Sequence, residues 1–275
     1  MIRKYLLFVC LVCTLPGFGQ RNNRVYKNLH EALSNPQHVY RLKLAYRHLD
    51  SLSSEIGKLT NLEELDLNNN NLKRLPKEIG NLKNLKKLNV FNNKLLVLPE
   101  EIGDLSRLEV LLLSGNQLKT LPASIGKLKL LKELSVKDNR LDSLPLELGD
   151  LTNLEQCFFS FNYLSFLPRT IGQCKKLEQL YLDHNVIQSL PPEIGNLRNM
   201  KYLYIGKNSL RVIPTQICNM EKLQELDLAY SGNIGPLASC LADLPVLDLL
   251  YIDTLSSTPY SILTQKNFHL KVIVQ

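Results

Sequence analysis

The sequence predicts an α/β fold in which short coils stack into an open solenoid around a parallel β-sheet of about ten strands. Three observations lead to this prediction. Residues 62–222 repeat every 23 residues, each repeat opens on an apolar–polar alternation, and an asparagine follows that alternation at a constant place. A fixed period of this kind is typical of solenoids, because one unit cannot bury its apolar face without neighbours.

The repeated unit reads L-x-x-L-x-L-x-x-N-x-L-x-x-L-P-x-x-I-G-x-L-x-x. Its copies begin, in one register, at Leu62, Leu85, Leu108, Leu131, Leu154, Leu177 and Met200. The asparagine position is held by Asn70, Asn93, Asn116, Asn139, Asn162, Asn185 and Asn208. Seven matches without a slip exclude chance, and the unit is identified as a leucine-rich repeat, which predicts a horseshoe-shaped solenoid with its sheet on the concave side.

Each part of the unit has a physical reason. The alternation L-x-x-L-x-L predicts a short strand with leucines inward, stacked roughly 4.8 Å from its neighbour. The asparagine amide is expected to satisfy buried backbone groups of its own turn and of the next one. Leu-Pro is expected to open a short helix, because proline suits a first helical turn. Ile-Gly is expected to let that turn close tightly.

The two ends of the solenoid depart from the pattern. Residues 20–38 predict a linker and a capping helix, with Asn28 and Glu31 as a capping box and Asn35-Pro36 as the stop. Repeats are predicted over 39–246, with Arg47 in the first asparagine position. An irregular cap is predicted over 247–275, with a short helix over 259–266 and a last strand over 270–274. A solenoid needs such caps because its terminal coils expose apolar surface.

Residues 1–19 predict a secretory signal peptide. Arg3 and Lys4 precede an apolar run, and Gly17-Phe18-Gly19 offers small residues before a cleavage point. The alternative is a retained membrane anchor, although the run is short for a bilayer span. Cleavage would export the chain to the periplasm, the cell surface or the medium, and would leave no integral membrane protein. It would also lower the net charge from +7 to +5.

Four cysteines follow the leader. Cys157 and Cys174 occupy leucine positions of one repeat and are expected to be small buried apolar residues. Cys218 replaces the glycine of Ile-Gly, and Cys240 lies almost one repeat later. The two would then sit side by side on adjacent coils, and an oxidising compartment would permit a disulfide between them.

The repeat resembles the 23-residue L-P-x-x-I-G class, and the chain is similar to secreted bacterial leucine-rich repeat proteins. Their first repeat often follows a Tyr-x-x-Leu-x-x-Ala-Leu-x-Asn-Pro cap, which here is formed by Tyr26, Leu29, Ala32, Leu33, Asn35 and Pro36. The resemblance covers about residues 26–252. It implies binding, usually of a protein, through the concave strand face, and it implies no particular partner.

No motif in the chain indicates catalysis, a cofactor or a metal. G-x-S-x-G, H-E-x-x-H and a phosphate-binding loop are absent from the sequence. Asp183 and His184 form an acid–base pair on the concave face, but no nucleophile has a matching place. Outward pairs such as Glu63 and Lys86 alternate in sign between neighbouring repeats, which predicts a self-neutralising ladder rather than a basic nucleic-acid surface. The sequence therefore predicts neither an enzyme nor a nucleic-acid partner.

The central outward strand position changes character along the chain. It reads Lys43, Asp66, Asn89, Leu112, Ser135, Phe158, Tyr181, Tyr204, Asp227 and Tyr251, and Phe161, Tyr202 and Tyr230 fall in nearby outward positions. These aromatics either stiffen the sheet by stacking or form a binding patch, because a large exposed apolar patch usually marks a binding site.

The predicted function is a secreted, non-catalytic recognition module. Its predicted ligand is a protein or peptide, with glycan binding or a structural adhesion role as alternatives.

Overall fold

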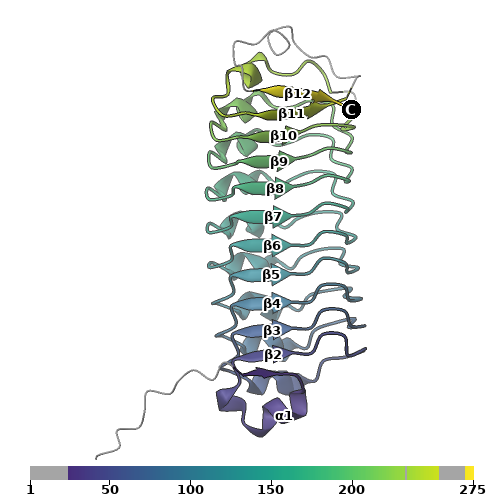
Figure 1. Ribbon diagram of the computed structural model, residues 1–275, viewed down its shortest axis with the longest axis vertical. Helices are drawn as coiled ribbons and strands as arrows, with labels where there is room; N and C mark the ends of the chain where they lie inside the picture. The colour runs from purple at the N-terminus through teal and green to yellow at the C-terminus, as the bar shows by residue number, and fades with distance from the viewer. Residues whose placement is uncertain (1–23, 233, 254–269) are drawn as a thin grey trace, which may run out of the picture.

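The structure, a computed structural model, describes residues 24–232, 234–253 and 270–275. These residues form one open, parallel sheet of twelve strands, in which strand order follows chain order from β1 to β12. Short 3₁₀ helices line the back of the sheet, and one α-helix lies across its N-terminal end (Figure 1). The predicted leader, residues 1–19, and the predicted helix over 259–266 lie outside the described residues.

The strands are short, and most hold three residues. They are β1 (Val25–Tyr26), β2 (Arg41–Lys43), β3 (Glu64–Asp66), β4 (Lys87–Asn89), β5 (Val110–Leu112), β6 (Glu133–Ser135), β7 (Gln156–Phe158), β8 (Gln179–Tyr181), β9 (Tyr202–Tyr204), β10 (Glu225–Asp227), β11 (Leu249–Ile252) and β12 (Lys271–Val274). The sequence predicted about ten strands. The two-residue strand β1 was not expected, and it adds to the sheet by pairing with β2.

The return legs are 3₁₀ helices of five residues each, apart from the three-residue η1. They are η1 (Pro36–His38), η2 (Ser54–Lys58), η3 (Lys77–Asn81), η4 (Glu100–Asp104), η5 (Ala123–Lys127), η6 (Leu146–Asp150), η7 (Arg169–Gln173), η8 (Pro192–Asn196), η9 (Thr215–Asn219) and η10 (Ser239–Asp243). The repeat proline was expected inside the first turn. In all seven repeats from Leu62 to Met200 it instead lies one residue before the helix, with extended backbone such as φ −68° and ψ 149° at Pro76.

The core is a single apolar spine between the sheet and the 3₁₀ helices. Leu65, Leu88 and Leu111 stack on consecutive strands with 0–1% of their surface exposed. Each strand pairs with the next in equivalent register, so residues one repeat apart lie side by side. We call the opposite, outward surface of the sheet the concave sheet face. Residues at the same repeat position therefore form a straight column across the strands.

The asparagines form a buried ladder of hydrogen bonds. Asn139 Nδ2 donates to the carbonyls of Val136 and Leu113 at 3.1 and 3.0 Å, and its Oδ1 accepts from the Leu118 N–H at 3.0 Å. Leu113 and Leu118 belong to the preceding coil, so the prediction that the asparagine serves the next coil was wrong. Ser231 takes the position in the unit after Asn208 and keeps one of these bonds, from its hydroxyl to the Ile205 carbonyl at 2.8 Å.

The repeat glycine has a different role from the one predicted. Gly195 has no left-handed backbone, so conformational freedom is not what it provides. A Cβ atom built there would lie 2.2 Å from the carbonyl oxygen of Gln216 in the next coil. The same close approach recurs along the column: a Cβ atom built on Gly149 would lie 2.4 Å from the carbonyl oxygen of Thr170. Glycine therefore sets the spacing between neighbouring 3₁₀ helices.

Helix α1 (Leu29–Ser34) covers the N-terminal end of the spine. Asn28 caps it, accepting from the backbone N–H groups of His30 and Glu31 at 2.8 and 3.3 Å. Glu31 forms an ion pair with Arg24. Ala32 is fully buried, and the helix ends before Asn35 as predicted. The cap thus supplies the apolar surface that the first coil lacks.

Candidate functional site

Three aromatic side chains stack across the concave sheet face. Phe158, Tyr181 and Tyr204 are the last residues of β7, β8 and β9, and strand register places them side by side. The ring centroids of Phe158 and Tyr181 lie 5.0 Å apart, and those of Tyr181 and Tyr204 lie 4.7 Å apart, at interplanar angles of 23° and 11°. All three side chains are half-buried. The three rings therefore stack, and their side chains remain partly exposed.

A hollow of about 540 Å³ opens beside this stack. Two small residues, Gly206 and Ala229, belong to its lining. They follow β9 and β10 at a repeat position that holds larger side chains in other coils. Its walls include Phe158, Tyr181, Tyr204, Asp183, His184 and Tyr230. The hollow therefore arises where large aromatic residues adjoin two positions that have almost no side chain.

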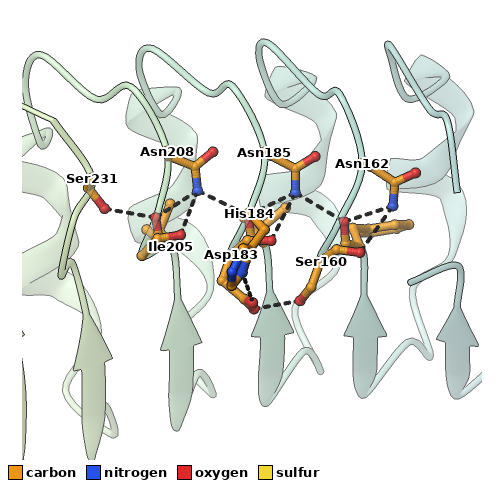
Figure 2. Close-up of polar contacts among 11 residues, drawn as sticks. Ser160, Asn162, Asp183, His184, Asn185, Ile205, Asn208 and Ser231 are labelled. Carbon is orange, nitrogen blue, oxygen red and sulfur yellow. Dashed lines mark hydrogen bonds and ion pairs between the residues drawn. The ribbon is translucent and has the colours of Figure 1, made fainter. Parts of the chain in front are cut away.

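A short chain of hydrogen bonds fixes one wall of the hollow (Figure 2). Asp183 Oδ1 accepts from the Ser160 hydroxyl at 2.5 Å, and Asp183 Oδ2 lies 2.9 Å from Nδ1 of His184. The His184 ring stacks on Phe161 with centroids 3.9 Å apart, and the Lys137 ammonium lies 5.1 Å from the Phe161 centroid. These contacts hold the wall in one conformation.

The same chain of bonds has the wrong order for nucleophilic catalysis. A serine nucleophile needs a base that takes its proton, and the base is normally a histidine. Here the Ser160 hydroxyl donates to Asp183, and His184 contacts the far oxygen of that carboxylate. The three residues are thus arranged to orient Asp183 and His184, and they do not activate Ser160.

The hydroxyl of Tyr204 also has a hydrogen-bond partner on the neighbouring strand. Tyr204 donates to Glu225, and burial together with this bond raises the pKa of Tyr204 well above its usual range. Burial also raises the pKa of Tyr181. Both side chains are therefore neutral at physiological pH.

Several residues beside the hollow adopt a backbone conformation that their residue type disfavours. The residue before each ladder position adopts a left-handed conformation, with φ between 52° and 69°. This column reads Tyr46, Asn69, Asn92, Gly115, Asp138, Phe161, His184, Lys207 and Tyr230. Asn, Asp and Gly adopt this conformation readily, whereas bulky residues do so at a cost of about 1 kcal/mol or more. Apart from Tyr46, the bulky residues of this column line the hollow or, as Phe161 does, stack on its wall, and strain of this kind is common at functional sites.

Replacing Tyr230 with asparagine is expected to raise the free energy of unfolding by roughly 0.5–1 kcal/mol, because asparagine tolerates φ 55° better. The same change should weaken ligand binding, since Tyr230 is 52% exposed on the wall of the hollow. Urea unfolding measures the first effect. The matched control is Asn92→Tyr, the reverse exchange at the equivalent position, which should destabilise the fold and leave binding unchanged. A Tyr230→Asn variant that loses stability would contradict the strain argument.

The structure places the predicted site residues in two groups. Phe158, Tyr181, Asp183, His184, Tyr204 and Tyr230 line the hollow, and Phe161 supports it by stacking on His184. Tyr202 lies outside the hollow, where its hydroxyl donates to Gln224 at 3.0 Å. Lys137, Lys207 and Asp227 line the hollow without having been predicted as site residues. Reading the column two residues after the last residue of each strand, rather than aromatic residues alone, would have pointed to Lys137.

The N-terminal half of the concave sheet face is polar and internally paired. Asp66 Oδ1 accepts from Asn89 Nδ2 at 3.1 Å, and Asp66 Oδ2 lies 4.0 Å from the Lys43 ammonium. The predicted charge ladder is present in part, with Lys86 3.1 Å from Glu63 and Lys132 2.8 Å from Glu109. Exposed pairs of this kind contribute little to stability. The two halves of the face therefore differ in character, and the aromatic half carries the candidate site.

The cysteines fall into two kinds. Cys157 and Cys174 are free and fully buried, as expected, and burial raises the pKa of the Cys174 thiol to about 11. Cys218 and Cys240 are joined by a disulfide, with Cα atoms 5.9 Å apart. The buried thiols are protonated at neutral pH and poorly reactive.

Two classes of feature were sought in the described residues. No helix there combines the length and the apolar character of a membrane span. In the same ranges, no group of three or more His, Cys, Asp or Glu side chains is arranged to hold a metal ion.

Comparison with known proteins identifies the family. A leucine-rich repeat region model matches residues 77–160, and a leucine rich repeat model matches residues 37–95 and 175–234. A solved leucine-rich repeat protein of Leptospira interrogans is 32% identical, with a TM-score of 0.56, over 92% of this chain and 82% of that one. The chain therefore belongs to the leucine-rich repeat family. No curated protein matches it.

Two plant receptors also share the fold. The ectodomain of the Arabidopsis thaliana receptor kinase GASSHO1/SCHENGEN3, solved with CASPARIAN STRIP INTEGRITY FACTOR 2, is 29% identical with a TM-score of 0.73. The Arabidopsis receptor kinase HAESA, solved with the peptide hormone IDA and the co-receptor SERK1, is 24% identical with a TM-score of 0.70. The alignments cover 82% and 85% of this chain, which spans only 28% and 40% of those proteins.

Proposed function

We propose that the protein is an exported, non-catalytic recognition module that binds a peptide or an extended protein segment in the aromatic hollow. The observation that carries this proposal is the contrast within one sheet face. The polar half pairs with itself, whereas the aromatic half keeps ring edges half-exposed beside a hollow of about 540 Å³. Exposed apolar surface of this kind usually marks a binding site, and tyrosine is enriched at protein interfaces.

The stacking favours a peptide over a glycan. Sugars bind aromatic residues by lying flat on a ring face. Here stacking at 4.7–5.0 Å covers both faces of the Tyr181 ring and one face each of Phe158 and Tyr204, so the middle of the stack offers ring edges. Ring edges together with the polar groups of Asp183 and His184 suit a peptide, whose backbone and side chains need both kinds of contact. Two similar receptors were solved with bound ligands, one of them a peptide hormone.

Export is part of the same proposal. The leader-like residues 1–19 and the disulfide between Cys218 and Cys240 both fit an oxidising compartment. We place the mature protein in the periplasm, at the cell surface or in the medium. A whole-surface adhesion role would make no use of the hollow, and it would be unaffected by local substitutions there.

Replacing both Phe158 and Tyr204 with alanine should weaken partner capture at least about tenfold, because each change removes contact surface worth more than 1 kcal/mol at an interface centre. The measurement is affinity capture from the organism's surface fractions and surroundings, followed by titration of the captured partner. The matched control is Tyr163→Ala with Phe166→Ala, two residues that are 61% and 52% exposed and do not line the hollow. Equal capture by all three proteins would reject the hollow as the site, and binding on a glycan array instead would favour a carbohydrate ligand.

A further inference from the structure

Asp227 ends β10 and lies on the concave sheet face beside Tyr204. Strand register pairs it with Tyr204 on one side and Tyr251 on the other. Its Oδ1 accepts from the Ala229 N–H at 2.9 Å. A Cβ atom built on Gly206 would lie 3.0 and 3.1 Å from the two carboxylate oxygens, which is tighter than ordinary contact. Glycine at 206 therefore leaves room for the carboxylate beside the floor of the hollow.

Asp66 occupies the same repeat position seven coils earlier and provides an internal comparison. Both carboxylates accept from a backbone N–H two residues on, at 3.1 Å for Asp66. Asp66 also has lateral partners, the amide of Asn89 and the ammonium of Lys43. Asp227 has tyrosines at both lateral positions, and the Tyr204 hydroxyl is directed to Glu225. Among the described residues, no cationic group lies within ion-pair distance of Asp227.

The surroundings of Asp227 disfavour a lone negative charge. Burial raises the pKa of its carboxyl, and the nearby charge of Asp183 acts in the same direction; the Ala229 N–H and the Lys207 ammonium act in the opposite direction but do not offset the burial. Asp183 itself is satisfied by Ser160 and His184. A cation brought to Asp227 would relieve this cost, and the adjacent aromatic rings would attract it further. Arginine suits such a place, because its planar guanidinium both pairs with a carboxylate and stacks on an aromatic ring.

We propose that the ligand places an arginine side chain in the hollow, where its guanidinium pairs with Asp227 and lies against the ring of Tyr204. This inference rests on the proposed peptide-binding function and adds the chemistry that the ligand must carry. Asp227 is then the specificity-determining residue of the site, and the aromatic stack supplies the contact surface around it.

A random peptide library displayed on phage tests the proposal, with selections on the wild-type protein, Asp227→Asn and the matched control Asp66→Asn. Wild type and Asp66→Asn should select peptides enriched in arginine over the starting library, and Asp227→Asn should not. One selected peptide is then synthesised with arginine and with citrulline, its neutral isostere. Citrulline should weaken binding to wild type about tenfold or more, and should change binding to Asp227→Asn little. Thermal unfolding checks that Asp227→Asn remains folded.

The other outcomes separate the two proposals. Selected peptides without arginine enrichment, or equal binding of the arginine and citrulline peptides, would overturn the arginine proposal and leave peptide binding intact. Enrichment that persists in Asp227→Asn would also overturn it, because the cation would then bind elsewhere. If wild type selects no peptide, or if selection is unaffected by the Phe158→Ala, Tyr204→Ala double variant, peptide recognition by the hollow fails and this inference fails with it.

Discussion

Replacing Asn139 with alanine is expected to lower the free energy of unfolding by about 3 kcal/mol, because it leaves several buried backbone groups without partners. Asn139 is 6% exposed. Its loss removes the acceptor for the Leu118 N–H and the amide donor to the carbonyls of Leu113 and Val136. These backbone groups are buried, so leaving them without partners carries their desolvation cost. The midpoint of urea unfolding, monitored by circular dichroism, measures this loss.

The matched control for this change is Asn153→Ala. Asn153 is half-buried but makes solvent-exposed hydrogen bonds: its Nδ2 donates to the carbonyl of Lys129 at 2.7 Å, and its Oδ1 accepts from the Lys176 ammonium at 2.7 Å. Because water can replace those partners, the control should cost well under 1 kcal/mol. If the two variants unfold at the same urea concentration, the ladder does not stabilise the solenoid as argued. Since Asn139 joins two coils, its loss should also broaden the transition as neighbouring coils uncouple.

The repeat made most of the fold predictable. Once Asn70 and Asn93 are seen to be equivalent, the register of every strand pair follows, and so does the stacking of Phe158, Tyr181 and Tyr204. The sense of the ladder did not follow, because a period carries no direction and the same spacing fits bonds to the coil before or after. The role of Gly195 was also hidden, since a sequence contains no distance between coils.

The site was less predictable than the fold. Exposed aromatic residues can be counted in a sequence, but the hollow depends on two small residues, Gly206 and Ala229, that carry no chemical signal of their own. The role proposed for Asp227 depends on its lateral contacts, which include no cationic side chain within ion-pair distance among the described residues. Asp66 and Asp227 look identical in the repeat, and only the lateral contacts distinguish the paired carboxylate from the unpaired one.

The disulfide occupies a place where the spacing between coils changes. Cys218 stands in the position that glycine holds in the preceding repeats, for example Gly195. Glycine there permits contacts too close for a Cβ atom, so a side chain at 218 requires the next coil to stand further away. The helices η9 and η10 accordingly approach each other less closely than earlier pairs. The bond to Cys240 therefore joins two 3₁₀ helices that pack less tightly than the earlier helix pairs.

Replacing both Cys218 and Cys240 with serine is expected to destabilise the C-terminal coils by about 3 kcal/mol, the loop-closure value for a bond that spans roughly this length of chain. The loss should be local, because each coil contacts mainly its neighbours. Hydrogen exchange should accelerate in β11 and β12 and stay unchanged in β4 and β5, which serve as the internal control. Unchanged exchange in β11 and β12 would show that packing alone holds the last coils. Since Asp227 ends β10, at the border of that segment, the same variant should also weaken ligand binding, linking the disulfide to the shape of the hollow.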